Sequence, residues 1–149
     1  MRWIAFVTVS LLALWVGRAD AIELASITIR NSSNSTIGSV DSDGTIRNSS
    51  GSSVGKIERD GTVRNGSNSA IGKVEGDGTV RDGSNSSIGK VESDGTIRNG
   101  SNSAIGKIES DGTIRNGSNH AVGKVEGYSP HLRGMVAAVL FFGGSVSVL

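Results

Sequence analysis

The chain has 149 residues, enough for one domain, and carries 15 basic and 14 acidic residues, a formal net charge of +1. It contains no Cys, which excludes disulfide bonds, thiolate metal sites and thiol nucleophiles. The near-zero net charge argues against a nucleic-acid partner, because neutralising phosphates requires a basic surface.

The first 21 residues predict a signal peptide rather than part of the fold. A short basic start precedes Trp3–Val16, a run of 14 almost entirely apolar residues. Small residues then occupy positions 19 and 21, where a signal peptidase reads the chain. The run is too short to cross about 30 Å of hydrocarbon as a helix. We therefore expect cleavage after Ala21 and export to the periplasm, the cell surface or the extracellular space.

A 17-residue string repeats along the rest of the chain, and Gly95–Asp111 shows it as GTIRNGSNSAIGKIESD. The first unit has Ile27 where the others have Gly, and the last has Tyr128 where the others have Asp, as the terminal units of repeat proteins often deviate. We expect a repeat region at residues 22–128 with six β-hairpin units, at 27–43, 44–60, 61–77, 78–94, 95–111 and 112–128.

Each unit contains two short β-like runs. In Thr96-Ile97-Arg98 an apolar residue alternates with polar ones, which indicates a strand. In the second run, Ala104–Glu109, the apolar residues Ile105 and Ile108 are three positions apart and would face opposite sides of a flat strand. A bulge at Gly106 could restore a common face. Alternatively, one face packs inside a ring and the other against a neighbouring unit.

Two turn sequences separate these runs, Asn99–Asn102 and Ser110–Gly112 in the fifth unit. Their Asn-Gly and Asp-Gly pairs are expected to supply residues that tolerate positive φ. Two turns per unit predict an all-β meander of about a dozen short strands. We expect a closed, propeller-like ring of antiparallel hairpins, because closure removes exposed strand edges. A short β-solenoid is the alternative.

The repeated charges predict a self-paired surface. Residues 27–127 contain seven Arg and five Lys against seven Asp and five Glu, a net charge of zero. Like residues recurring in register would form rows around the array, and rows of opposite sign can neutralise each other.

The tail at residues 129–149 is the least ordinary segment, because Gly134–Leu149 contains no charge. It could pack on the ring, plug it or add closing strands, or it could insert into a membrane or a partner protein. We expect a plug, because each unit offers few aliphatic side chains and Phe141 and Phe142 supply large apolar area. Membrane contact by the tail is the less favoured alternative.

The repeat sequence GTIRNGSNS–IGK–ESDGTIRN is followed by an apolar tail with Met135–Val139 and the pair Phe141 and Phe142. In both features the chain resembles the secreted 5-fold β-flower repeat proteins of Bacteroides-like bacteria. The resemblance covers Ile27 to about Phe142. It implies an all-β ring of hairpins with five-fold pseudo-symmetry, and it implies no activity and no functional residues. This chain departs from that pattern with six copies and only two Phe residues in the tail. Five-fold closure would require the first and last copies to share one blade, and the alternative is a ring of six.

No residue stands out as catalytic, cofactor-binding or metal-ligating, and no cofactor is expected. His120 and His131 belong to no recurring constellation and are expected on the surface. The turn Val40–Gly44 is the nearest match to a calcium loop, but it has two carboxylates and no distal Glu. The expected function is therefore that of a non-enzymatic exported protein of structural or interaction type. The alternative is a multivalent binding module for polar cell-surface glycans, and a polar glycan or a protein is the expected partner.

Overall fold

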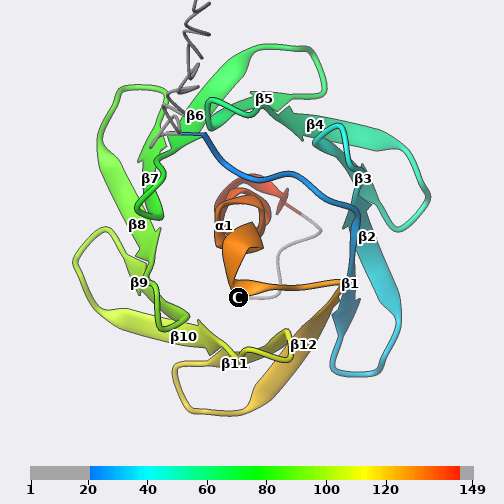
Figure 1. The fold of residues 1–149 in the computed structure, drawn as a ribbon, viewed down its shortest axis with the longest axis vertical. Coiled ribbons are helices and arrows are strands. Elements are labelled where there is room, and N and C mark those ends of the chain that lie inside the picture. The colour runs from blue at the N-terminus through cyan, green and yellow to red at the C-terminus, as the bar shows by residue number, and fades with distance from the viewer. Residues whose placement is uncertain (1–20, 145–149) are drawn as a thin grey trace, which may run out of the picture.

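A closed ring of twelve antiparallel strands forms the body of the protein in the computed structural model, which describes residues 21–144 (Figure 1). The prediction of an all-β ring of hairpins is confirmed. The signal-peptide prediction concerns residues 1–21, and residues 1–20 lie outside the described part. The strands are β1 (Ile27–Asn31), β2 (Thr36–Val40), β3 (Thr45–Asn48), β4 (Ser53–Ile57), β5 (Thr62–Asn65), β6 (Ala70–Val74), β7 (Thr79–Asp82), β8 (Ser87–Val91), β9 (Thr96–Asn99), β10 (Ala104–Ile108), β11 (Thr113–Asn116) and β12 (Ala121–Glu126).

The ring closes with the same pairing that joins its neighbouring units. Between units, β2 pairs with β3 so that Val40 lies opposite Ile46. At the closure, β12 pairs with β1 in the equivalent register, and Val125 lies opposite Ile29. The chain therefore has six hairpins in the ring rather than five, and neither terminal strand is left with an unpaired edge.

Both kinds of turn are three-residue loops. At the turns between units, the Gly112 N–H donates to the carbonyl of Glu109, and Gly112 has φ +87°. At the hairpin ends, the Asn102 N–H donates to the carbonyl of Asn99, and Asn102 itself has φ +62°. The prediction that the Asn-Gly pair supplies the positive φ is therefore wrong. A type I turn followed by a left-handed residue places that residue three positions after the first Asn.

The second strand of each hairpin carries the bulge that the Ile–x–x–Ile spacing suggested. In β10 the register with β9 shifts between Ala104 and Gly106, so Ile105 is the extra residue. Ile108 is buried, whereas Ile105 remains half-buried. The bulge therefore does not bring both side chains to the same degree of burial. Ile105 and its counterparts in the other units pack against the core as partly buried residues.

The core is built mainly from two aliphatic residues of each unit and a helix inside the ring, and Ile22, Ile27 and Leu132 add to it. The first strand of a unit contributes a residue such as Ile97 and the second a residue such as Ile108, at 0% and 2% exposure. An eight-stranded barrel is just wide enough for side chains to fill, and diameter grows with strand number. Twelve strands therefore leave a lumen that aliphatic side chains alone do not fill.

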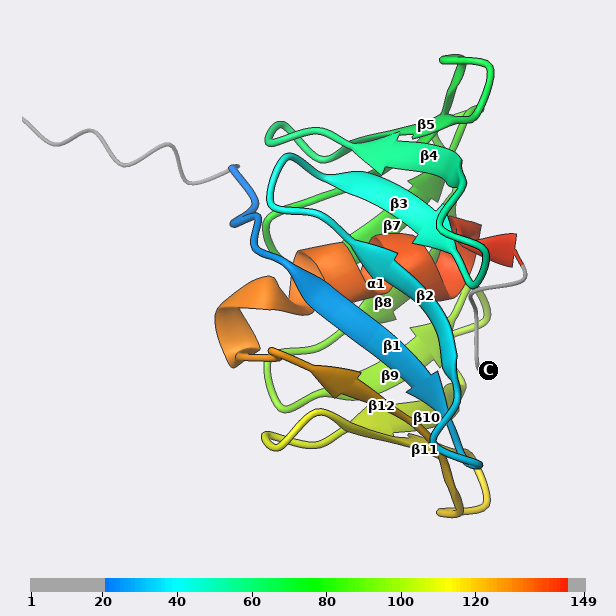
Figure 2. The same cartoon turned by 90° about the vertical axis from the view of Figure 1, so that its right-hand side faces the viewer.

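That lumen holds the helix α1 (Arg133–Phe142), and the 3₁₀ turn η1 (Pro130–Leu132) precedes the helix at one end of the ring (Figure 2). Every residue from Gly134 to Leu140 is buried. The expected plug is thus present, but it is helical, a conformation that the sequence did not indicate. A helix that is apolar on all sides shows no amphipathic period and is stable only where it is enclosed. The helix lies off-centre and contacts β6, β7 and β8 (Figure 1).

Candidate functional site

The most exposed repeated feature is the set of six hairpin tips, which splay outward around the ring like petals (Figure 1). Every tip is exposed to solvent, and every tip residue is Ser, Asn, Gly or His. The tips comprise residues 32–35, 49–52, 66–69, 83–86, 100–103 and 117–120.

The same pattern of hydrogen bonds recurs in every unit and shapes each tip. In the fifth unit, the Asn99 side-chain oxygen accepts from the backbone N–H groups of Ser101 and Ser103, each at 3.0 Å. Asp82 replaces this Asn in the fourth unit and accepts the equivalent pair at 2.9 and 3.0 Å. The backbone conformation of the tip is thus set by local bonds, and the tip serines are exposed to solvent.

A row of six Arg side chains ties each hairpin to the turn beside it. Arg98 shows the pattern, with Nε donating to Glu92 at 3.1 Å and Nη1 donating to the carbonyl of Asn102 at 3.0 Å. The closing pair, Arg30 with Glu126 at 2.7 Å, completes the row where the two ends of the sheet meet, and it lowers the pKa of the Glu126 carboxyl. The predicted neutralising rows are therefore present on the outer surface. The other four pairs are Arg47–Asp41, Arg64–Glu58, Arg81–Glu75 and Arg115–Glu109.

The Asp residues of the turns between units are held locally as well. The Thr79 backbone N–H donates to Asp77 at 2.9 Å, and the Thr79 hydroxyl donates to the other carboxylate oxygen at 3.0 Å. The Lys90 ammonium also donates to Asp77 at 3.1 Å. Together these bonds, the backbone bond first, lower the pKa of Asp77 to about 2. The carboxylate therefore fastens the turn and leaves little capacity for another ligand.

The carboxylates of Val40–Gly44, the nearest match to a calcium loop, also accept hydrogen bonds from nearby protein groups. Asp41 accepts a hydrogen bond from Arg47 at 2.8 Å, and Asp43 accepts from the backbone and hydroxyl of Thr45. Lys56 lies 3.7 Å from Asp43. These carboxylates therefore face cations and turn donors instead of converging on a common point. Within residues 21–144, no group of three or more His, Asp or Glu side chains is arranged to hold a metal ion.

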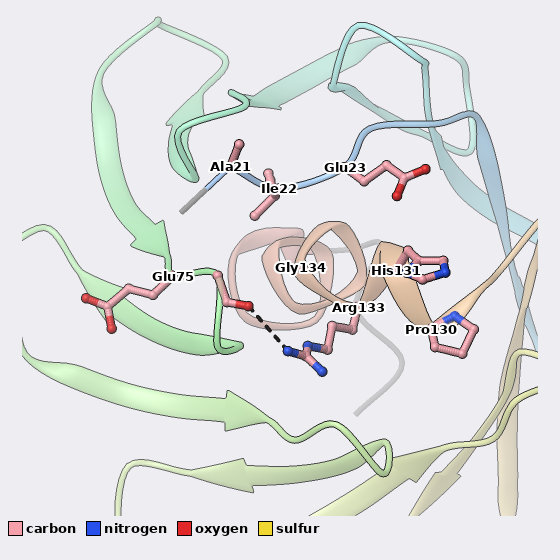
Figure 3. A pocket seen from close by; sticks show the side chains of 9 residues that line it. Ala21, Ile22, Glu23, Glu75, Pro130, His131, Arg133 and Gly134 are labelled. Atoms are coloured by element: carbon pink, nitrogen blue, oxygen red, sulfur yellow. Dashed lines mark hydrogen bonds between the residues drawn. The ribbon is translucent and has the colours of Figure 1, made fainter. Parts of the chain in front are cut away.

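A hollow of about 280 Å³ opens at the end of the ring where α1 begins (Figure 3). The N-terminal segment from Ala21 crosses above α1 on one side, and the Glu75–Gly76 turn forms the other side. Arg133 donates to the carbonyl of Gly76 at 3.3 Å and so joins the helix to the ring. His131 lines this hollow and His120 lies on a hairpin tip, and both are exposed, as predicted.

Two glycines inside the ring have a role that sequence reasoning only partly anticipated. A β-carbon at Gly89 would lie 2.3 Å from the ring of Phe141, and one at Gly72 would lie 2.3 Å from the ring of Phe142. The sequence predicts only a bulge or a close backbone approach at the mid-strand glycine. Which glycines receive an aromatic ring depends on where the helix lies. None of the described helices has the length and apolar character needed to cross a membrane.

The sequence matches a known protein family. A family model described as 5-fold beta-flower protein matches residues 18–102, more than half of the chain. No curated protein and no solved structure matches the chain. The match agrees with the closed ring of hairpins and with the repeated sequence of the units. The family description names a 5-fold protein, whereas this ring has six hairpins. The chain therefore belongs to the 5-fold beta-flower protein family and is a structural repeat protein of that kind.

Proposed function

We propose that this ring is exported and acts as a non-enzymatic protein of structural or interaction type. The observation that carries the proposal is the use of the recurring charged residues within the ring. Each of the six repeated Arg side chains bonds a carboxylate of a neighbouring turn or strand. Because the same chemistry recurs in every unit, it holds the units together, whereas an active site is usually a singular arrangement.

The ring offers partners a rigid, symmetric display. Local hydrogen bonds fix the hairpin tips, and strand pairing all round the ring fixes their spacing. A weak contact made by one tip can therefore be repeated by its neighbours, and a partner with matching repeats gains avidity without any tight single site.

Binding of polar glycans is the second candidate function, and the composition of the tips favours it. The tips expose Ser hydroxyls and Asn amides and carry no Lys, Arg, Asp or Glu, so they suit neutral hydroxyl-rich ligands. The aromatic platforms that commonly stack on sugars are lacking there, because Phe141 and Phe142 pack toward the inside of the ring. Such binding would depend on hydrogen bonds repeated over several tips.

A glycan array probed with the labelled protein separates the two candidates. The matched variant replaces one serine in each of three alternate tips, Ser50→Glu, Ser84→Glu and Ser118→Glu, and leaves the strands unchanged. Reproducible array binding that falls at least tenfold in the triple variant would establish the glycan function and displace the leading proposal. An empty array supports the leading proposal, and fractionation of the producing cells tests export. Retention of the protein in the cytosol would refute that part.

A further inference from the structure

We infer that Ile22 is the N-terminal residue of the mature protein and acts as a latch that seats the new chain end on the ring and the plug. The inference rests on the proposed export, because it requires the peptidase that removes signal peptides. Hydrolysis adds one water across the Ala21–Ile22 bond. It leaves a carboxylate on Ala21 and an α-amino group on Ile22, which is protonated at neutral pH.

The first residue that this cleavage leaves is also the first buried residue in the described part of the chain. Ala21 is exposed, whereas Ile22 is 7% exposed and belongs to the core. The Ala-x-Ala pattern at residues 19–21 places the cut at this bond, on the chain before it folds. A cut after Ile22 would remove this core side chain, and a cut before Ala21 would leave an exposed residue at the chain end.

The side chain of Ile22 is seated on the plug helix. A β-carbon at Gly134 would lie 3.0 Å from Cγ2 of Ile22, so the absence of a side chain in the helix makes room for the isoleucine. Figure 3 shows Ile22 directly above Gly134 at the mouth of the hollow. Glycine is otherwise a poor helix former, and this contact gives a packing reason for its presence at the start of α1.

The backbone nitrogen of Ile22 is seated on the ring. It donates to the carbonyl of Arg59, in the turn between β4 and β5, at 2.9 Å. After cleavage the same nitrogen is an ammonium group, and a charged donor makes a stronger hydrogen bond to a carbonyl than an amide does. Three residues farther along the same N-terminal segment, the Ala25 N–H donates to the sulfur of Met135 in α1 at 3.2 Å. The segment thereby joins a ring turn and the plug at one end of the barrel.

Two measurements on the mature end test the latch. The full chain is exported with its own leader, and the mass of its N-terminal peptide is measured; we expect Ile22 as the first residue. Retention of an uncleaved chain would refute export itself, whereas export with a cut at another bond would refute this inference alone. For protein that begins at Ile22, we then compare acylation of the α-amino group in the native and denatured states. We expect at least tenfold slower reaction in the native state, with Lys56 as the exposed internal control. Equal rates would overturn the inference.

A double-mutant cycle isolates the contact with the helix. Ile22→Ala should lower the melting temperature by at least 5 °C, whereas Glu23→Ala, at the adjacent exposed residue, should leave it within 1 °C. Gly134→Ala should destabilise the parent protein, in which Ile22 occupies the space above the helix. In the Ile22→Ala background the same substitution should be neutral or stabilising, because the shorter side chain leaves that space empty. Additive effects of the two substitutions would show that Ile22 does not rest on the helix and would refute the latch.

Discussion

Substitution of Gly89 tests whether the inward-facing glycines exist to admit the plug. Gly89 lies in β8, on the part of the ring that α1 contacts. A β-carbon there would lie 2.3 Å from two ring atoms of Phe141 and 2.7 Å from the carbonyl oxygen of Arg98. The aromatic ring could move, but the carbonyl belongs to the paired strand β9 and cannot yield without disturbing the sheet. Gly89→Ala and Gly89→Val should therefore destabilise the protein despite their better strand propensity.

The expected magnitude follows from overpacking. Forcing a side chain into a filled site typically costs about 1–3 kcal/mol, and two contacts below van der Waals distance place Gly89→Ala near 3 kcal/mol. Alanine loses less backbone entropy on folding than glycine, which offsets about 0.5–1 kcal/mol of this cost. The free energy of unfolding should therefore fall by about 2 kcal/mol. For a domain of this size, that loss lowers the melting temperature by about 8 °C. Gly89→Val adds two further carbons and should cost more.

Urea and thermal unfolding followed by circular dichroism measure this loss, with two matched controls. Gly55→Ala meets only the equivalent backbone oxygen, Arg64 O at 2.7 Å, and should cost about 1 kcal/mol. Gly83→Ala meets atoms only at 3.5 Å or more, and it should change stability by less than about 0.5 kcal/mol. In a Phe141→Ala background, Gly89→Ala should lose at least about 1 kcal/mol of its effect. If Gly89→Ala melts like the parent protein, the packing argument is wrong.

Three further predictions follow from the plug, the turn carboxylates and the turn glycines. Removal of Gly134–Leu149 should lower the melting temperature by more than 15 °C and expose dye-binding apolar surface, because buried helix residues lose their packing and uncover the ring; an unchanged, dye-silent melt would contradict this. The pKa of Asp77 is about 2, below the ordinary 3.9 of an unfolded Asp, so its contribution should be complete above about pH 5 and lost as pH falls toward 2. Acid titrations of the parent and Asp77→Asn should therefore converge at low pH, and a constant difference would refute the assignment. Gly95→Ala should cost at least about 3 kcal/mol in denaturant unfolding, because Gly95 has φ +87° and a β-carbon would lie 2.0 Å from the carbonyl oxygen of Ile108; a loss below about 1 kcal/mol would contradict this.

The candidate surface was only partly predictable from the sequence. Neutral charge rows could be anticipated, because opposite charges recur at a fixed spacing and must meet their neighbours in any regular array. The partners could not, because they depend on register. Arg98, for instance, bonds Glu92 of the preceding turn, and Arg30 bonds Glu126 across the closure. The hollow beside α1 left no sequence signal, since its lining comes from three segments far apart in the chain.

By itself, the sequence determined the repeat, the strand class and the presence of two turns in every unit. These features depend on local chemistry, namely alternating side chains and Asn, Asp and Gly at fixed offsets, and local chemistry is legible without the fold. The turn conformation is local too, but the sequence did not show the turn type that makes Asn102 rather than Gly100 the left-handed residue. Only the tertiary structure decided that six hairpins close and that the tail is a helix. The tail shows no amphipathic period because every residue from Gly134 to Leu140 is buried. A helix of this kind is stable only where it is enclosed, and that enclosure exists only after twelve strands have closed.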